Sequence, residues 1–338
     1  MARVTFARTD NSILTQWWWN VDRWLFVAIC LLIGVGILLT MAASPPVAER
    51  IGLDSFYFVK RHFIYVLLFF VVMIGVSLLS EQNVRRFALG VFVVTFILLI
   101  LTPLIGYEIK GAKRWISVIG FSLQPSEFIK PVLVILTAWM LAEKKKNPEV
   151  PGNLFALIFY GLVVCMLLLQ PDMGMIFLMT IIFFTQFFLA GLPLILILVS
   201  SSLGVVGMVS AYFVFPHVQT RVDRFLNPST QDRFNERYQI TQSLDAFSSG
   251  GFWGQGPGEG IVKKHLPDGH ADFIFSVGAE EYGAIFCLFI IAIFGFLVIR
   301  SLMRVMQESN MFVILAVGGG LCLRLRCKQP LTWPQLSI

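Results

Sequence analysis

Charged side chains are scarce in this chain. Lys, Arg, Asp and Glu make up 14% of its 338 residues, whereas hydrophobic residues make up 57%. A soluble domain is nearer a quarter charged, so this composition excludes an ordinary soluble protein. The mean hydropathy of +0.78 instead predicts an all-α polytopic membrane protein, a bundle of about eight or nine transmembrane helices.

Long basic runs and grouped cysteines are also missing. The longest basic run is Lys144-Lys145-Lys146, and the net charge of +6 is spread over short loops. This pattern suits anionic lipid headgroups better than nucleic acid. The five cysteines have neither zinc-ligand nor haem-attachment spacing, so we interpret those in apolar runs as buried thiols.

Apolar runs of about 18 residues with few charges are typical of transmembrane helices. Backbone polar groups must be satisfied internally in lipid, and the runs lack the alternation of barrel strands, so we expect helices. No pattern of a cleavable signal peptide precedes the first run. The expected spans are residues 24–43, 63–79, 87–104, 128–142, 154–169, 173–189, 192–215 and 273–299, with a ninth that starts at 311.

The distribution of Lys and Arg predicts the orientation. If residues 1–23 form a cytoplasmic N-terminal segment, the inward loops carry more basic residues than the short outward loops, as the positive-inside rule requires. The loop 105–127 and a large periplasmic loop, 216–272, between helices seven and eight then face outward.

The large loop itself contains two patterns. Ile240, Leu244 and Phe247 lie at i, i+4 and i+7, which predicts an amphipathic helix on the membrane surface. The stretch GGFWGQGPGEG follows. It lacks the preceding strand and following helix of a phosphate-binding fingerprint, so we interpret its glycines as tight backbone turns.

Charge gathers where the eighth span begins, in HLPDGHADFIF, residues 265–275. Charges at a membrane edge are costly and therefore suggest function. Asp272 is either a helix N-cap, worth about 1 kcal/mol, or a catalytic carboxylate, and the two roles are compatible. His265, Asp268, His270 and Asp272 have metal-binding side chains, but their spacing matches no standard metal motif.

Two carboxylates lie within the same apolar run. Ser276 and Glu280 would share a helix face with Asp272, with Glu280 about 12 Å deeper along the helix, whereas Glu281 would point elsewhere. Both glutamates either pair with Lys or Arg of a neighbouring helix or line a polar path through the membrane.

Basic side chains recur in two loops. GAKRWI places Lys113 and Arg114 beside Trp115. Such cations bind phosphate oxygens or form a charge pair at the lipid headgroups. In DRFLNP, Arg224 follows Asp223 and is a candidate for a loop ion pair.

Two further segments flank helices. QPSEFIK places Glu127 and Lys130 at i and i+3, which predicts an ion pair near a helix start. QPDMG predicts a tight turn in which Asp172 caps the next helix.

Taken in order, these segments resemble the SEDS family (shape, elongation, division and sporulation proteins). The matching segments are VDRW…AASPPVAERIGLDSFYFVKRH, GAKRWI, LQPSEFIKP, QPDMG, RVDRFLNP, YQITQSLDAFSSGGFWGQGPGEG and KKHLPDGHADFIFSVGAEEYG. So many ordered matches are highly specific, and the first resembles the members that act in cell division. The resemblance assigns residues 24–310 to the family's transmembrane domain.

The resemblance implies a peptidoglycan glycosyltransferase of the bacterial inner membrane, which extends glycan strands from lipid II at the periplasmic side of the division septum. The family's essential aspartate falls on Asp272, which would be the general base for the acceptor hydroxyl, while Lys113 and Arg114 would hold a pyrophosphate. Further substrate-binding candidates are Glu127, Lys130, Arg224, His270 and Glu280.

The resemblance also implies partners. These are lipid II, a class B penicillin-binding transpeptidase and other divisome proteins. No cofactor is certain, although Mg²⁺ or Mn²⁺ would assist departure of the leaving group. Two alternative functions are a lipid II flippase, with Glu280 and Glu281 lining its path, and a non-catalytic divisome scaffold.

The resemblance ends near Gly320. The last segment, LCLRLRCKQPLTWPQLSI, is neither apolar enough to span a bilayer of about 30 Å nor similar to the family. We therefore expect residues 311–338 to form an incomplete ninth helix and an aberrant tail, produced by a truncation or a frameshift.

Overall fold

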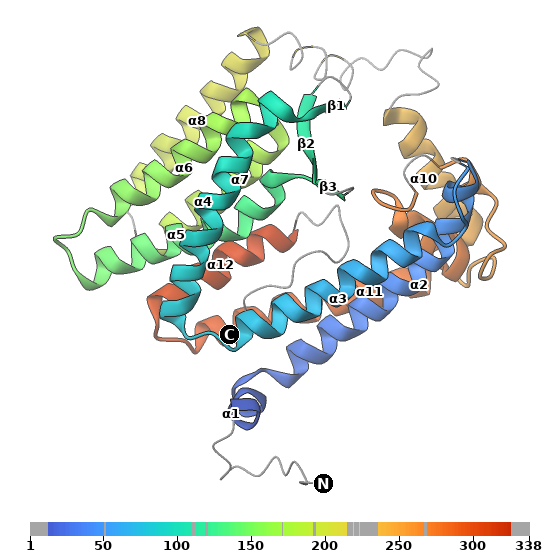
Figure 1. Cartoon of the computed structure of the whole chain (residues 1–338), viewed down its shortest axis with the longest axis horizontal. Helices are drawn as coiled ribbons and strands as arrows, with labels where there is room; N and C mark the ends of the chain where they lie inside the picture. Colours follow the sequence, from blue (N-terminus) through green and yellow to red (C-terminus); the bar gives the residue numbers. More distant parts are fainter. Residues whose placement is uncertain are drawn as a thin grey trace. The chain divides into compact units, whose positions relative to one another are not determined.

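Most of the chain is helical in the computed structural model (Figure 1). The structure describes residues 13–325 apart from 51, 110–111, 119–120, 171, 192–193, 215–218, 220–222, 224–235 and 267–268. The helices are α1 (Ile13–Asn20), α2 (Arg23–Arg50), α3 (Tyr57–Ser77), α4 (Glu81–Ile105), α5 (Pro125–Lys146), α6 (Gly152–Leu169), α7 (Met173–Leu189), α8 (Leu194–Val214), α10 (Glu236–Gly250), the short 3-10 helix η1 (Val262–Lys264), α11 (Ile274–Met306) and α12 (Met311–Leu325).

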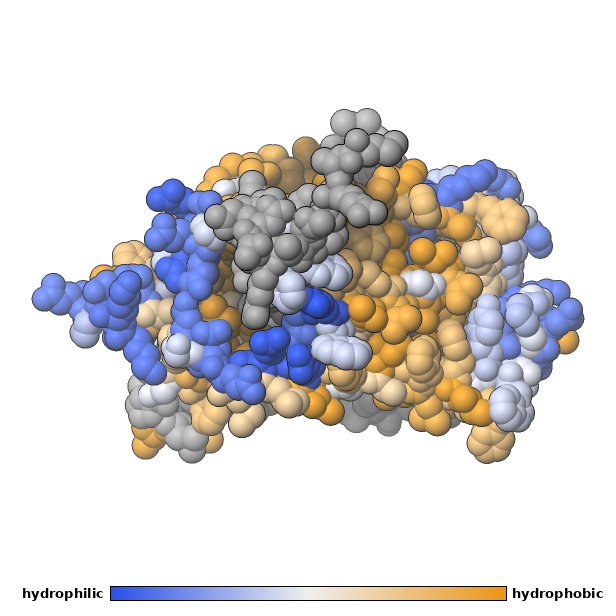
Figure 2. Space-filling model, turned by 90° about the horizontal axis from the view of Figure 1, so that it is seen from below, coloured by the Kyte–Doolittle hydropathy of each residue, from blue (hydrophilic) through white to orange (hydrophobic). Residues whose placement is uncertain are grey.

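Each expected span coincides with a helix over most of its described residues. By length and composition, six of them (α2, α3, α4, α5, α6 and α11) can cross a membrane, and the apolar helices Met173–Leu189 and Met311–Leu321 are shorter. Figure 2 shows hydrophobic side chains over wide areas of the face that it draws. The fold is therefore an all-α polytopic membrane fold, as predicted.

Contacts divide the chain into two units. The first contains the described residues up to Ile74 and from Ser202 to Arg300, and the second contains those from Gly75 to Ser201 and from Ser301 onward. The boundaries fall within α3, α8 and α11.

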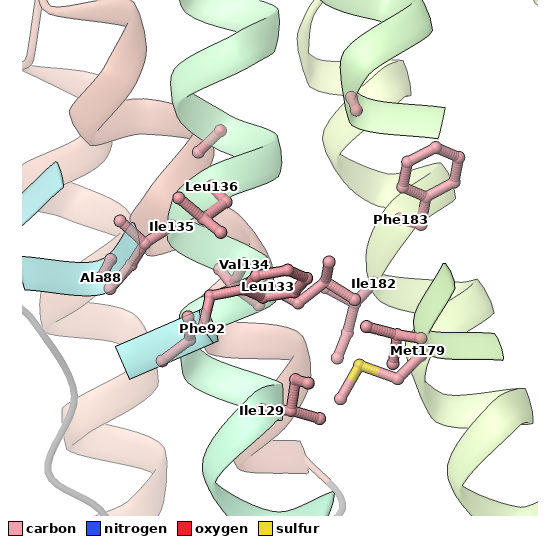
Figure 3. Packing of buried hydrophobic residues seen from close by; sticks show 14 of the residues in the cluster. Ala88, Phe92, Ile129, Leu133, Val134, Ile135, Leu136, Met179, Ile182 and Phe183 are labelled. Atoms are coloured by element: carbon pink, nitrogen blue, oxygen red, sulfur yellow. The ribbon is translucent and has the colours of Figure 1, made fainter. Parts of the chain in front are cut away.

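Helix α5 is the centre of the second unit, where it contacts α4, α6, α7 and α12. Its apolar residues point in several directions, which is typical of a helix that is surrounded by others. Figure 3 shows Phe92 of α4, Leu133 of α5 and Ile182 of α7 among the buried residues of this core. Because lipid is as apolar as this core, close packing and interhelical hydrogen bonds stabilise it rather than exclusion of water.

The buried Gln186 of α7 supplies such hydrogen bonds. Its Oε1 accepts from Thr137 Oγ1 at 2.6 Å, and its Nε2 donates to the carbonyl oxygens of Val134 at 2.8 Å and Leu315 at 3.2 Å. A Cβ atom at Gly319 would lie 2.8 Å from Gln186 Nε2. The glycine therefore lets α12 approach closely enough for one amide to link α5, α7 and α12.

In the first unit, α2 and α11 contribute most of a second buried core. A Cβ atom at Gly278 would lie 2.7 Å from Leu39 Cδ2, so this glycine permits close packing. At the start of α2, Asp22 Oδ1 accepts the N–H groups of Trp24 and Leu25, and Asp22 Oδ2 accepts from Arg300 Nε at 3.0 Å. Asp22 thus caps α2 and joins it to α11.

The stretch 105–127 contains a small sheet that our sequence analysis missed. It is antiparallel and three-stranded, with β2 (Ala112–Val118) between β1 (Tyr107–Ile109) and β3 (Phe121–Leu123). In β2, Lys113 and Ser117 are exposed on one face, whereas Ile116 on the other face is buried, as expected for a strand with one face toward the protein.

The hydrogen bonds of Gln186 give a testable prediction. We expect Gln186→Leu to lower the free energy of unfolding by about 1–2 kcal/mol, because the carbonyl oxygens of Val134 and Leu315 lose their amide donor. Thermal unfolding in detergent measures the change. As a control, Phe188→Leu on an exposed position of the same helix should unfold like the unmodified protein. A similar loss in both variants would contradict this account.

Candidate functional site

Asp272 is an exposed residue just before helix α11. The helix begins at Ile274, and the carbonyl oxygen of Phe273 accepts the N–H groups of Ser276 at 3.0 Å and Val277 at 3.2 Å. Among the described residues, none donates a hydrogen bond to the Asp272 carboxylate, so the predicted N-cap is not formed by this side chain. The carboxylate is instead free to accept a proton from a bound molecule.

The segment that precedes Asp272 is held at several points. Arg50 Nη2 donates to the carbonyl oxygens of Lys264 at 2.7 Å and Leu266 at 3.3 Å. The side chain of Leu266 is fully buried in the core of the first unit. Further along, the His270 ring packs on Phe58, with their centroids 4.2 Å apart.

Glu280 and Glu281 are both enclosed, with 0% and 1% exposure. Glu280 Oε1 accepts the N–H of Val262 at 2.7 Å, and Glu280 Oε2 accepts the N–H of Lys263 at 2.8 Å. Glu281 forms a buried ion pair with the Lys263 ammonium. We predicted pairing with a Lys or Arg of a neighbouring helix. Glu281 pairs in this way with Lys263 of the short helix η1, whereas Glu280 accepts only the backbone N–H groups of Val262 and Lys263.

Helix α11 is broken at Gly283, whose φ of 82° and ψ of 177° are not helical. The glycine-rich loop 250–260 supplies the hydrogen bonds that the break removes. The carbonyl oxygens of Glu280 and Glu281 accept the N–H groups of Gln255 at 2.9 Å and Gly256 at 3.0 Å. On the other side of the break, the N–H groups of residues 284 and 285 donate to the carbonyl oxygens of residues 251 and 252, at 2.9 and 3.4 Å.

This close approach requires glycine on both sides of the contact. A Cβ atom at Gly250 would lie 2.0 Å from the Ala279 carbonyl oxygen, one at Gly254 2.1 Å from that of Glu281, and one at Gly283 2.3 Å from that of Phe252. Gly251, Gly254, Gly256 and Gly258 also have positive φ, so the predicted tight turns are confirmed.

Helix α10 confirms the predicted helix in the large loop and packs on α11. Ser243 Oγ and Ser276 Oγ share a hydrogen bond of 2.7 Å, and the Phe247 and Phe275 rings lie 5.8 Å apart. The three residues of the predicted apolar stripe do not share one environment. Phe247 makes this internal contact, whereas Ile240 and Leu244 are exposed.

In the second unit, Arg114 of β2 is already engaged by protein groups. Its Nη1 lies 3.6 Å from Asp172 Oδ2, and its Nε donates to the Gln170 carbonyl oxygen at 3.3 Å. Asp172 Oδ1 in turn accepts the N–H of Met175, which confirms the predicted cap of α7. The neighbouring Lys113 is exposed and is therefore the more accessible cation.

The predicted ion pair between Glu127 and Lys130 is confirmed near the start of α5. Both side chains are partly buried, at 26% and 16% exposure. The two residues are three positions apart and lie on the same face of the helix, as the sequence spacing predicts.

Two predicted residues, Arg224 and Asp268, lie outside the part of the chain that the structure describes. No three His, Cys, Asp or Glu side chains of the described residues gather in the way that a metal site needs.

Comparisons with known proteins extend over nearly the whole chain. The sequence model of the FtsW/RodA/SpoVE family, described as cell cycle proteins, matches residues 23–328. A probable peptidoglycan glycosyltransferase FtsW of Caulobacter vibrioides is 44% identical over 319 residues, which cover 94% of this chain and 81% of that protein. A protein of the same description from Trichlorobacter lovleyi is 37% identical over 86% of this chain and 77% of its own length.

Two solved structures have a similar fold. One is a chain from a structure described as the coordination of polymerization and crosslinking by a peptidoglycan synthase complex. It has a TM-score of 0.71 at 22% identity and covers 94% of this chain and 91% of its own. The rod shape determining protein RodA of Thermus thermophilus has a TM-score of 0.60 at 21% identity, over 90% of this chain and 82% of its own.

The contacts of Arg114 predict a structural effect on substitution. We expect Arg114→Met to lower the free energy of unfolding by about 1 kcal/mol, because Asp172 and the Gln170 carbonyl lose a donor. Lys113→Met, at the exposed neighbouring position, should change it by less than about 0.5 kcal/mol. Thermal unfolding in detergent, followed by tryptophan fluorescence, compares the two. Equal stability of both variants would show that the Arg114 contacts contribute nothing.

Proposed function

Because the chain belongs to the FtsW/RodA/SpoVE family of cell cycle proteins, we propose that it is a peptidoglycan glycosyltransferase that extends glycan strands from lipid II. Relatives with this activity in their descriptions are up to 44% identical over most of the chain. The observation that carries the proposal is the exposed Asp272 carboxylate, which no described residue engages although the chain around it is held firmly.

Asp272 acts as the general base in this proposal. Its carboxylate accepts the proton of the acceptor sugar's 4-hydroxyl as the hydroxyl oxygen attacks the anomeric carbon of the donor. The new glycosidic bond forms while the bond from that carbon to the pyrophosphate oxygen breaks. Undecaprenyl pyrophosphate leaves with the electron pair.

Cationic side chains would bind the pyrophosphate. Lys113 is exposed and suits this role, whereas Arg114 has Asp172 and Gln170 as protein partners and would add charge from a fixed position. Further substrate-binding candidates are Glu127, Lys130, Arg224 and His270.

The chain is a multi-pass membrane protein, and we propose that its membrane is the bacterial inner membrane. We further propose that its N-terminus is cytoplasmic and that it acts at the periplasmic side of the division septum. We also propose that a class B penicillin-binding transpeptidase acts as its partner and supplies the crosslinking step. A structural neighbour from a complex that couples polymerization to crosslinking supports such a partner.

The two glutamates on which the flippase hypothesis rested are not available to a transported lipid. Glu280 and Glu281 are enclosed by protein and bound to residues 262 and 263, so they do not line an open polar path. A scaffold without catalysis would give no function to the exposed Asp272 carboxylate, which no residue of the described part of the chain engages.

Substitution of Asp272 tests the proposed function. We expect Asp272→Asn, with the transpeptidase partner present, to lower the rate of glycan extension from lipid II by at least about 100-fold, because the amide cannot accept the proton. Gel analysis of labelled glycan strands measures the rate.

The control is Asp245→Asn, which makes the same change at an exposed position of α10 and should leave the rate unchanged. Normal polymerisation by Asp272→Asn would refute the assignment of the base. Restored division by that variant in cells without the intact protein would favour the scaffold.

A further inference from the structure

Residues 262–266, which precede Asp272, are held by two side chains of opposite charge. A carboxylate accepts from their N–H groups, and a guanidinium donates to their carbonyl oxygens. The Glu280 carboxylate accepts the N–H groups of Val262 and Lys263, at 2.7 and 2.8 Å. The Arg50 guanidinium donates to the carbonyl oxygens of Lys264 and Leu266. Hydrogen bonds with one charged partner are stronger than neutral ones, so this five-residue segment has a defined position on α2 and α11.

Glu280 contacts the segment where the backbone has no other partner. Val262 and Lys263 open the short helix η1, and the first N–H groups of a helix have no acceptor within it. A carboxylate with two oxygens satisfies both at once. The side chain of Lys263 is fixed as well, through its buried pair with Glu281.

The environment of Glu280 excludes a direct contact with substrate. Its side chain is 0% exposed, and each oxygen already accepts a hydrogen bond. A Cβ atom at Gly260 would lie 2.9 Å from the Glu280 Cδ and 3.0 Å from Oε2. The loop therefore closes over the carboxylate, and an added Cβ at residue 260 would push the carboxylate from its place.

We propose that Glu280 is a positioning residue for the reaction. It binds the amides of residues 262 and 263 and, together with Arg50, fixes residues 262–266, which precede Asp272 in the chain. The inference rests on the proposed function of Asp272. It assigns Glu280 no contact with lipid II and no proton transfer.

The variant Glu280→Gln tests this role in the full-length protein. A glutamine oxygen can accept from one of the two amides, but its NH₂ group then faces the other N–H, and that bond is lost. We expect amide hydrogen exchange in residues 261–266 to become about tenfold faster. With the transpeptidase partner present, kcat for glycan extension should fall about tenfold while KM for lipid II changes by less than about twofold.

Two further variants separate the loss of the hydrogen bond from the loss of charge and from a failure to fold. Glu259→Gln removes an exposed carboxylate from the same loop and should behave like the unmodified protein in both measurements. Gly260→Ala keeps the Glu280 charge but displaces its carboxylate, so it should reproduce the faster exchange and the lower kcat. If Glu280→Gln does not fold, Gly260→Ala decides the question.

Three outcomes would overturn the proposal. Unchanged exchange in residues 261–266 would show that Glu280 does not hold the segment. Faster exchange with normal kcat, when Asp272→Asn is inactive, would show that the hold does not position the base. A raised KM with unchanged kcat would indicate substrate binding by Glu280. If the unmodified protein extends no glycan, the proposed function fails, and the exchange measurement alone decides whether Glu280 holds the segment.

Discussion

An apolar helix that loses its internal hydrogen bonds must find replacements within the protein, because lipid offers none. Helix α11 meets this constraint at Gly283 by exchanging backbone hydrogen bonds with the loop 250–260. The N–H groups of Gln255 and Gly256 donate to the carbonyl oxygens of Glu280 and Glu281. Beyond the break, two N–H groups of the helix donate to carbonyl oxygens of the loop. The position of the loop is therefore tied to the backbone of α11.

Two buried carboxylates become tolerable through the same arrangement. A buried charge is costly unless it is paired or well hydrogen-bonded. Helix η1, which follows the loop, brings the two amides that bind Glu280 and the Lys263 ammonium that pairs with Glu281. In return, the two carboxylates fix the backbone of Val262 and Lys263 and the side chain of Lys263, upstream of the exposed Asp272.

Sequence reasoning found the helices, the turns at Gly254 and Gly256, and the pair of Glu127 with Lys130, because each follows from local periodicity, composition or spacing. It found the kind of partner for Glu281 but not Lys263 itself, since that residue comes from a loop whose path depends on the break in α11. The break was not predicted, because a single glycine such as Gly283 is tolerated within an apolar helix. The sheet around Lys113 was missed because its strands are short.

The central claim is that loop 250–260 replaces the missing hydrogen bonds of α11. The most direct test is residue-resolved amide hydrogen exchange at Gln255, Gly256, Ala284 and Ile285 in the folded protein. The account predicts that all four amides are protected to a degree similar to that of amides in the middle of α11, since each has a backbone acceptor. Rapid exchange at Gln255 and Gly256 with protection at Ala284 and Ile285 would indicate an unbroken helix and would contradict the account.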